Sequence, residues 1–326
     1  MRSKKTLGFL IKVLIVLLAL FFLYKQLISK GDVISTDLNK IRVNIRENFL
    51  TILLVVLMMF VNWFLEALKW RTLIYKIEKI SLNQSIKAVF AGITVSSFTP
   101  NRVGEYAGRV FCIQKADKVQ AVLITVIGSM AQLITTIIFG LLGFLLLPNL
   151  MPDFKILLSD FVFSYPLMVF VVILLIVLLI TLFLNASVFS VILSKFKFLN
   201  KYSKYNEIFS FYNYSDLLET LLYSIARYFV FTTQFFILLL IFDVNVSYID
   251  FLILTTTMLF VISIIPTIAI AEISTRSSVA LFLFTLVSNN VTGILSATFV
   301  MWFINLVLPA LIGIGVILTL NFFRNK

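Results

Sequence analysis

The chain has 326 residues, of which 61% are hydrophobic and 13% are charged, and its formal net charge is +12. A soluble domain carries roughly 25% charged residues, so this composition excludes an ordinary soluble protein. Several apolar runs reach the ~20 residues of a membrane-spanning helix, and they lack the alternating pattern of a membrane β-barrel. We predict an all-α polytopic membrane protein with about six to eight transmembrane helices.

Histidine is absent, and Cys112 is the single cysteine. The chain therefore cannot form an internal disulfide, and it lacks the side chain that most often binds metals or acts as a general base. Its basic residues lie in short loops between apolar runs, which the positive-inside bias explains better than nucleic-acid binding does. We expect no metal, no cofactor and no nucleic-acid partner.

The N-terminal part begins with three basic residues and an apolar run at about 7–24, which predict an uncleaved first span with a cytoplasmic N-terminus. Residues 35–48 fit either an interfacial amphipathic helix or a plain loop. A second span covers about 49–68, and Lys69 and Arg71 begin the basic stretch that marks its cytoplasmic end.

The middle of the chain contains one short apolar run, 86–98, with basic residues on both sides. It is too short to cross a bilayer, so we predict a re-entrant hairpin that enters and leaves on the cytoplasmic side. Three further spans are predicted at about 119–147, 161–185 and 217–242.

The C-terminal part holds two apolar halves within 249–288, which fit either an external hairpin or two full spans, and a last span at about 292–320. Its basic end predicts a cytoplasmic C-terminus. The whole chain, 1–326, is predicted to be one membrane domain in which span, span, broken hairpin and long span occur twice. The second copy would be upside down, which gives inverted repeat halves 1–148 and 161–326, an arrangement typical of transporters.

A polar motif interrupts the apolar pattern at Pro100, which should end one helix near Thr99 and allow another to begin by Gly104. The exposed amides of the new helix N-terminus would carry partial positive charge. Together with Arg102 they predict an anion site inside the membrane.

A second motif repeats this outline with Pro266, Glu272 and Arg276. In both motifs an arginine follows a glutamate by four residues, as Arg109 follows Glu105, so the two charges can pair on one helix face. Pairing makes the burial of both charges tolerable. Such pairs can also be purely structural and merely fix the hairpins.

Arg227 lies near the middle of its span and needs a carboxylate or a phosphate nearby. Glu66 lies one turn from Asn62 on the second span, whereas Glu219 lies near a span end and is interpreted as a rim residue. The candidate substrate-binding or transport residues are Glu66, Arg102, Glu105, Arg109, Arg227, Glu272 and Arg276. The predicted helix-breaking residues are Pro100, Gly104 and Pro266. The predicted interhelical hydrogen-bond partners are Gln132, Gln234 and Asn305.

The run Pro100–Glu105 resembles the Pro-x-Arg-x-Gly-Glu signature of the lysylphosphatidylglycerol synthase transmembrane-region family, also called flippase-like integral membrane proteins. The segment Asn62–Arg71 resembles the end of that family's second span, and the resemblance extends over about 7–320. The second motif departs from the family pattern, because Thr267–Ala271 contains no glycine. The resemblance implies a domain that translocates a modified phospholipid between leaflets. It also implies that a chain ending at Lys326, without the family's cytosolic domain, does not aminoacylate lipids and is not an enzyme.

Three functions remain open at this stage. The first is a lipid flippase or transporter of the cytoplasmic membrane, whose partner is a membrane lipid with an anionic or zwitterionic head group. The second is an accessory subunit that docks a partner membrane enzyme. The third is a membrane-embedded enzyme with Glu105 or Glu272 as general base, which lacks a recognisable nucleophile–base pair. No Gly-Lys-Ser/Thr phosphate loop is present, so we expect no use of ATP by this chain.

Overall fold

The computed structural model describes residues 38–99, 102–151, 165–185, 207–265 and 269–319, together with five isolated positions near the N-terminus. Every regular element in these ranges is helical, which confirms the all-α prediction. The predicted first span at about 7–24 lies almost entirely outside the described residues, as do Pro100 and Pro266.

Five helical segments of the described chain are long and apolar enough to cross a membrane, which makes this a multi-pass membrane protein. They are α4 (Phe49–Ile74), α7 (Lys118–Leu146) with the short η2 (Leu147–Asn149), α9 (Tyr165–Leu184), α12 (Tyr214–Ile241), and the continuous α15 (Val291–Trp302), η5 (Phe303–Val307) and α16 (Leu308–Thr319). These bounds confirm the predicted second to fifth spans and the last span. Polar caps begin several of them, such as Asp117, whose carboxylate accepts from the amides of Val119 and Gln120.

The segment before α4 is helix α3 (Leu38–Glu47), so the helical interpretation of residues 35–48 is confirmed over the loop. Ile41 is buried while the neighbouring Arg42 and Val43 are exposed, as the amphipathic pattern predicts. The Asn44 side-chain amide donates to the carbonyl of Ile241 at 3.1 Å, which fastens α3 to the end of α12.

Two pairs of packed helices are shorter than the five candidate spans. The first is α5 (Leu82–Ser96) with α6 (Gly104–Val110), and the second is α13 (Tyr248–Ile264) with α14 (Ala269–Phe284). At about 1.5 Å per residue, the longest of the four, α13, is roughly 25 Å long, short of the ~30 Å hydrocarbon core. The re-entrant arrangement of 86–98 stays a prediction, as does the choice between an external hairpin and two full spans for 249–288.

The close packing of α5 against α6 depends on glycine. A Cβ atom on Gly108 would lie 2.6 Å from the Cα of Gly92, so the two backbones touch with no room for a side chain. The N-terminus of α5 is fixed by a capping box, in which Ser81 and Gln84 satisfy each other's backbone amides.

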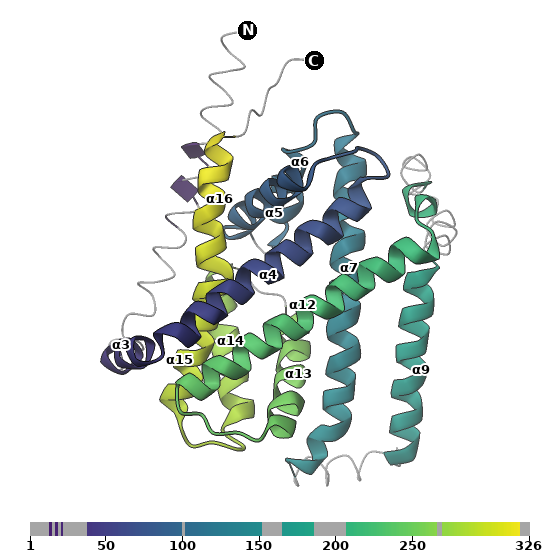
Figure 1. Ribbon diagram of the computed structural model, residues 1–326. Coiled ribbons are helices and arrows are strands. Elements are labelled where there is room, and N and C mark those ends of the chain that lie inside the picture. Colours follow the sequence, from purple (N-terminus) through teal and green to yellow (C-terminus); the bar gives the residue numbers. More distant parts are fainter. Residues whose placement is uncertain are drawn as a thin grey trace.

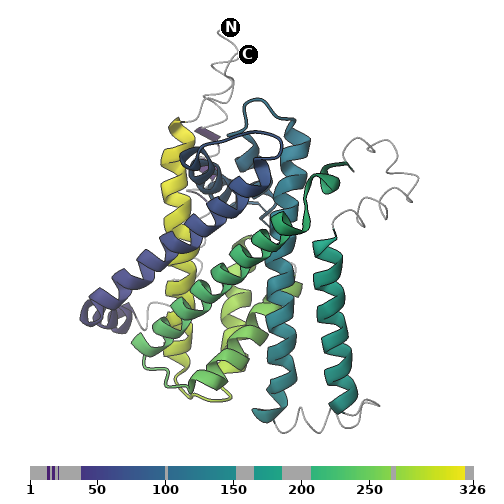
Figure 2. The same cartoon turned by 45° about the vertical axis from the view of Figure 1, so that its right-hand side comes forward.

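The hairpins lie at opposite ends of the molecule (Figures 1 and 2). Helices α5 and α6 lie at the end where α16 finishes, and α13 and α14 lie at the end where α15 begins. Helices α4 and α12 run side by side obliquely across the middle, while α13 packs along α7 and α16 along α5. This placement is what an inverted repeat requires, although the division into halves 1–148 and 161–326 stays a prediction.

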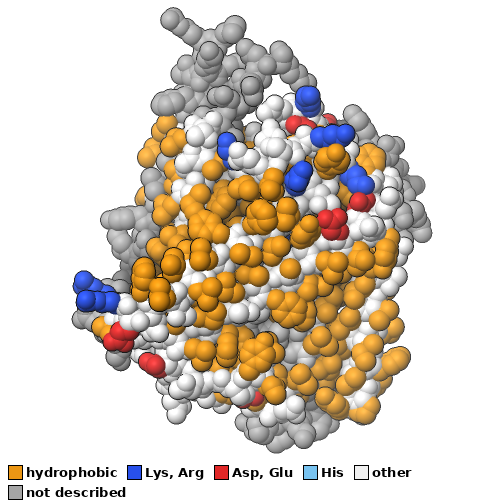
Figure 3. All heavy atoms as spheres, viewed as in Figure 1, with side chains coloured by type: hydrophobic (Ala, Val, Ile, Leu, Met, Phe, Trp, Pro, Cys, Tyr) orange, Lys and Arg blue, Asp and Glu red, His pale blue; other side chains and the backbone are white. Residues whose placement is uncertain are grey.

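The outer face is a continuous band of apolar side chains over α4, α12 and their neighbours (Figure 3). Lysine, arginine and acidic side chains gather at the edges of this band. Large apolar residues such as Leu50, Phe170 and Ile249 are mostly exposed, as expected of side chains that face lipid.

Candidate functional site

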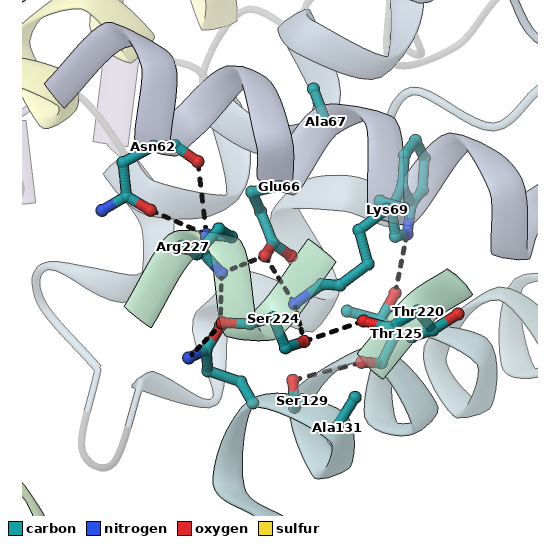
Figure 4. A network of polar contacts seen from close by, with 12 residues as sticks. Asn62, Glu66, Ala67, Lys69, Thr125, Ser129, Ala131, Thr220, Ser224 and Arg227 are labelled. Atoms are coloured by element: carbon teal, nitrogen blue, oxygen red, sulfur yellow. Dashed lines mark hydrogen bonds and ion pairs between the residues drawn. The ribbon is translucent and has the colours of Figure 1, made fainter. Parts of the chain in front are cut away.

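The site centres on Glu66, a carboxylate on α4 that is buried among helices. It forms ion pairs with Lys69 Nζ at 2.7 Å and with Arg227 Nη1 (Figure 4). It also pairs with Arg109 Nη2 at 2.8 Å. The side chain of Lys69 is 1% exposed and that of Arg109 is 2% exposed. One carboxylate therefore holds three cations, contributed by α4, α6 and α12.

Arg227 projects from α12 into this cluster and is held by neutral groups as well. Its Nε donates to the carbonyl and the side-chain oxygen of Asn62, at 3.2 Å and 2.8 Å. Its Nη1 donates to Gln132 Oε1 at 3.2 Å, and the guanidinium lies 5.3 Å from the ring centre of Trp63. These contacts orient Arg227 and offset part of its desolvation.

Arg109 joins the cluster to the first hairpin. It pairs with Glu105 one turn earlier on α6, as predicted, and it reaches further to Glu66 on α4, which was not predicted. Its guanidinium lies 5.9 Å from the ring centre of Trp70. Arg109 is thus an interior residue that joins α6 to α4.

A second group of charges joins the two hairpins to each other. Arg102 Nη2 lies 2.6 Å from Glu272 Oε1 on α14, and Arg276 Nε and Nη2 both reach the same oxygen at 3.1 Å. The Glu272–Arg276 pair confirms the prediction. Arg102 adopts a left-handed backbone conformation with φ 57°, which is unusual for a side chain of this size and marks a functional or strained position.

The turn before α6 differs from its predicted role. Gly104 donates its amide to Thr99 Oγ1 at 2.8 Å, so this amide is not open to an anion as the sequence suggested. A Cβ atom at Gly104 would lie 2.5 Å from the carbonyl oxygen of Val95, so the turn can close only with glycine at this position.

A cavity of about 540 Å³ lies between the hairpins and the crossing helices α4, α7 and α12. Its lining includes the polar residues Asn62, Arg102, Gln132, Arg227, Glu272 and Arg276. A smaller cavity of about 100 Å³ shares the three arginines and extends toward α15. Arg102, Arg227, Glu272 and Arg276 therefore line the same cavity. Glu66, Glu105 and Arg109 do not line it, but their ion pairs connect them to Arg227.

Sequence reasoning missed Lys69 as a member of the site. It was taken as the first residue of a cytoplasmic basic stretch, yet it is buried and paired with Glu66 three residues earlier. The i,i+3 spacing of the two was the available signal.

The predicted interhelical hydrogen bonds are present for Gln132 and Gln234. Asn305 instead donates to the carbonyl of Met301 in its own helix, so the prediction for Asn305 was wrong.

Fold and site together define a multi-pass membrane protein with a charged cavity enclosed by two opposed hairpins. The family model for the lysylphosphatidylglycerol synthase TM region matches residues 9–313, and the chain belongs to this family. No curated protein and no solved structure matches the chain. Family membership points to a membrane function connected with lipids.

Proposed function

We propose that the protein is a lipid transporter of the flippase type, which moves a phospholipid or a lipid-linked head group between the leaflets of the cytoplasmic membrane. The observation that supports this most is the cavity of about 540 Å³, lined by three arginines and a glutamate and placed between hairpins from opposite ends. A polar head group is costly to move through hydrocarbon, and a polar cavity lowers that cost. Broken hairpins that meet around such a site are typical of transporters.

The contact between Arg102 and Glu272 is the natural gate in this proposal. It connects the loop before α6 to α14, so it holds the two hairpins together on one side of the cavity. Release of this ion pair would let the hairpins separate and open the cavity toward one leaflet. Glu105 would act indirectly, because it pairs with Arg109, which in turn pairs with Glu66.

We place the end with α5 and α6 on the cytoplasmic side. Exposed lysines such as Lys76, Lys79 and Lys115 lie in the loops between α4 and α5 and between α6 and α7, at the end where the positive-inside bias puts them. The end with the α14–α15 loop then faces outward.

The test is lipid movement in proteoliposomes that contain the purified full-length protein. A fluorescent phospholipid is placed in both leaflets, and its outer-leaflet fraction is followed with a membrane-impermeant quencher. We expect Glu105→Gln and Glu272→Gln to reduce the rate at least roughly tenfold, because each loses a charge-assisted contact worth about 1.5–3 kcal/mol, while both variants stay folded. Glu219→Gln is the matched control, since Glu219 is exposed near the start of α12.

Normal lipid movement in both glutamate variants would contradict the proposal. Two rival functions have their own readouts in the same preparation. A stoichiometric protein that copurifies while no lipid moves would indicate an accessory subunit, and chemical conversion of the labelled lipid would indicate an enzyme.

A further inference from the structure

We propose that helix α3 is a surface site for anionic phospholipids of the surrounding leaflet, whose phosphate groups are bound by Arg42 and Arg46. The site lies on the outside of the molecule, apart from the cavity between the hairpins. The inference does not depend on lipid transport, but it rests on the orientation proposed above, in which α3 lies at the outward-facing end.

The side chains of α3 form two separate stripes. Ile41 is buried, Ile45 is half-buried against the core, and Asn44 donates to a backbone carbonyl of α12 at 3.1 Å, so this face is fastened to the protein. Arg42 and Arg46 are also four residues apart, and both are exposed. Because residues at this spacing share a helix face, the two guanidinium groups meet the same surroundings.

The two arginines are not used within the protein. No hydrogen bond or ion pair joins either side chain to another described residue. The acidic residues at this corner are Glu47 on α3 and Asp243 just after α12, and both are exposed. Glu47 is one and five residues from the arginines, so it does not have the spacing of three or four that favours a pair. Both guanidinium groups are therefore available to an external anion.

The position of α3 places these groups beside lipid head groups. Helix α4 begins two residues after α3 ends, and its first side chains, Phe49 and Leu50, are 61% and 78% exposed, as expected where a helix enters lipid. Helix α3 does not continue the line of α4 (Figures 1 and 2). Lysine or arginine side chains gather at the place of α3, at the margin of the apolar band (Figure 3). A helix at this boundary lies at the depth of the lipid phosphates.

The distribution of basic residues indicates a phosphate ligand. The α12–α13 turn (242–247) and the α14–α15 loop (285–290), at the same end as α3, contain no lysine or arginine, as the positive-inside bias predicts for an outer end. Arg42 and Arg46 run against this bias. The exposed loop cations at the opposite end are lysines, whereas an arginine can donate two parallel hydrogen bonds to one phosphate. Arginines at an end without other described loop cations therefore fit binding of a phosphate group.

The experiment measures which lipids surround α3 in the purified full-length protein in phosphatidylcholine nanodiscs. A donor fluorophore is attached to Val43→Cys in a Cys112→Ser background, since Val43 is 50% exposed next to Arg42. Energy transfer is compared for equal small fractions of phosphatidylglycerol and phosphatidylcholine that carry an acceptor on the acyl chain. We expect phosphatidylglycerol to be enriched around α3 at least roughly fivefold, the factor that one basic residue contributes at an anionic surface. Equal transfer to the two lipids, or none to either, would overturn the inference.

Variants assign the enrichment to the arginines. The double substitution Arg42→Gln and Arg46→Gln should abolish it, and since both side chains are exposed the variant should fold normally. Lys79→Gln with Lys115→Gln is the matched control, because it removes the same charge from exposed positions at the opposite end and should leave the enrichment unchanged. Enrichment that survives in the arginine variant, or that falls equally in the lysine variant, would contradict the assignment to α3.

Two further measurements identify the ligand chemistry. Arg42→Lys with Arg46→Lys keeps the charge and removes the paired donors, so it should lose part of the enrichment, and full retention would contradict phosphate binding by the guanidinium groups. Inorganic phosphate at millimolar concentration is the soluble source of the same chemistry. It should lower the enrichment no more than chloride of equal ionic strength does. A specific loss with phosphate would assign the site to a soluble anion and overturn the assignment to a lipid.

The results separate this inference from the proposed function. Nanodiscs offer the lipid to both ends of the molecule, so the readout is the same whichever end faces outward. Enrichment at α3 without lipid movement in proteoliposomes would leave the inference standing and refute the transporter. Lipid movement without enrichment at α3 would leave the transporter standing and refute the inference.

Discussion

The Glu66→Gln substitution tests whether one carboxylate holds the interior of the protein together. Glutamine keeps the shape of the side chain and removes its charge. Lys69, Arg109 and Arg227 would then lie close together with no central anion, and the first two are nearly inaccessible to water. The variant should therefore lose stability through repulsion and poor solvation of three buried cations.

The expected loss follows from the burial of the partners. Breaking one buried ion pair by removing a single partner costs about 3–5 kcal/mol, because an uncompensated charge is left behind. The three contacts of Glu66 share one carboxylate, so their costs do not add. We expect a loss of about 3–5 kcal/mol, a large part of the ~5–15 kcal/mol that stabilises a typical folded protein.

The assay is denaturant unfolding of the purified protein in mild detergent, followed by tryptophan fluorescence. Glu219→Gln serves as the control and should change stability by about 0.5 kcal/mol or less, as an exposed substitution does. Adding Lys69→Met to Glu66→Gln removes one stranded cation and should restore part of the loss. A Glu66→Gln variant as stable as the wild type would refute the reasoning.

Three further predictions concern stability and reactivity outside the charge clusters. Gly108→Ala should destabilise the first hairpin by about 1–3 kcal/mol in thermal unfolding, because its Cβ would overlap the backbone of α5. Gly315 has open space around it, so Gly315→Ala is the control and should be neutral or stabilising by about 0.5 kcal/mol. Burial raises the pKa of the Cys112 thiol to about 12, so maleimide should label Cys112 at pH 8 far more slowly than it labels a small solvent-exposed thiol. Rapid labelling of Cys112 would contradict its burial. Tyr212→Phe removes a hydrogen bond of 2.8 Å to the carbonyl of Leu73 at the end of α4 and should cost about 1 kcal/mol in the same unfolding assay; an unchanged stability would show that this bond contributes nothing.

The membrane spans could be predicted because hydropathy and length decide them locally. The predicted span at about 119–147 corresponds to α7 (Lys118–Leu146), and that at about 217–242 corresponds to α12 (Tyr214–Ile241). The second span was predicted to end at residue 68, but α4 continues to Ile74. The reason is that Lys69, which reads as a flanking residue, is neutralised by Glu66 and stays inside.

The site could be predicted only as far as helical spacing reaches. The pairs Glu105–Arg109 and Glu272–Arg276 follow from four-residue spacing and are present. The contacts of Glu66 with Arg109 and Arg227, and of Arg102 with Glu272, join residues far apart in the chain. They depend on how α4 crosses α12 and on how the hairpins meet, which no local pattern encodes.

The most direct test of the transport proposal is whether the cavity can be reached from both sides of the membrane. Ser263 lines the cavity and is exposed, so Ser263→Cys in a Cys112→Ser background reports its accessibility. Cysteines at Gln114 and Asn289, in loops at opposite ends of the molecule, mark the two sides (Figure 1). A membrane-impermeant thiol reagent is applied to right-side-out and to inverted vesicles. The transporter predicts that each marker reacts from one side only and that Ser263→Cys reacts from both. Reaction of Ser263→Cys from one side under every condition would show a closed-ended pocket and contradict the proposed transport.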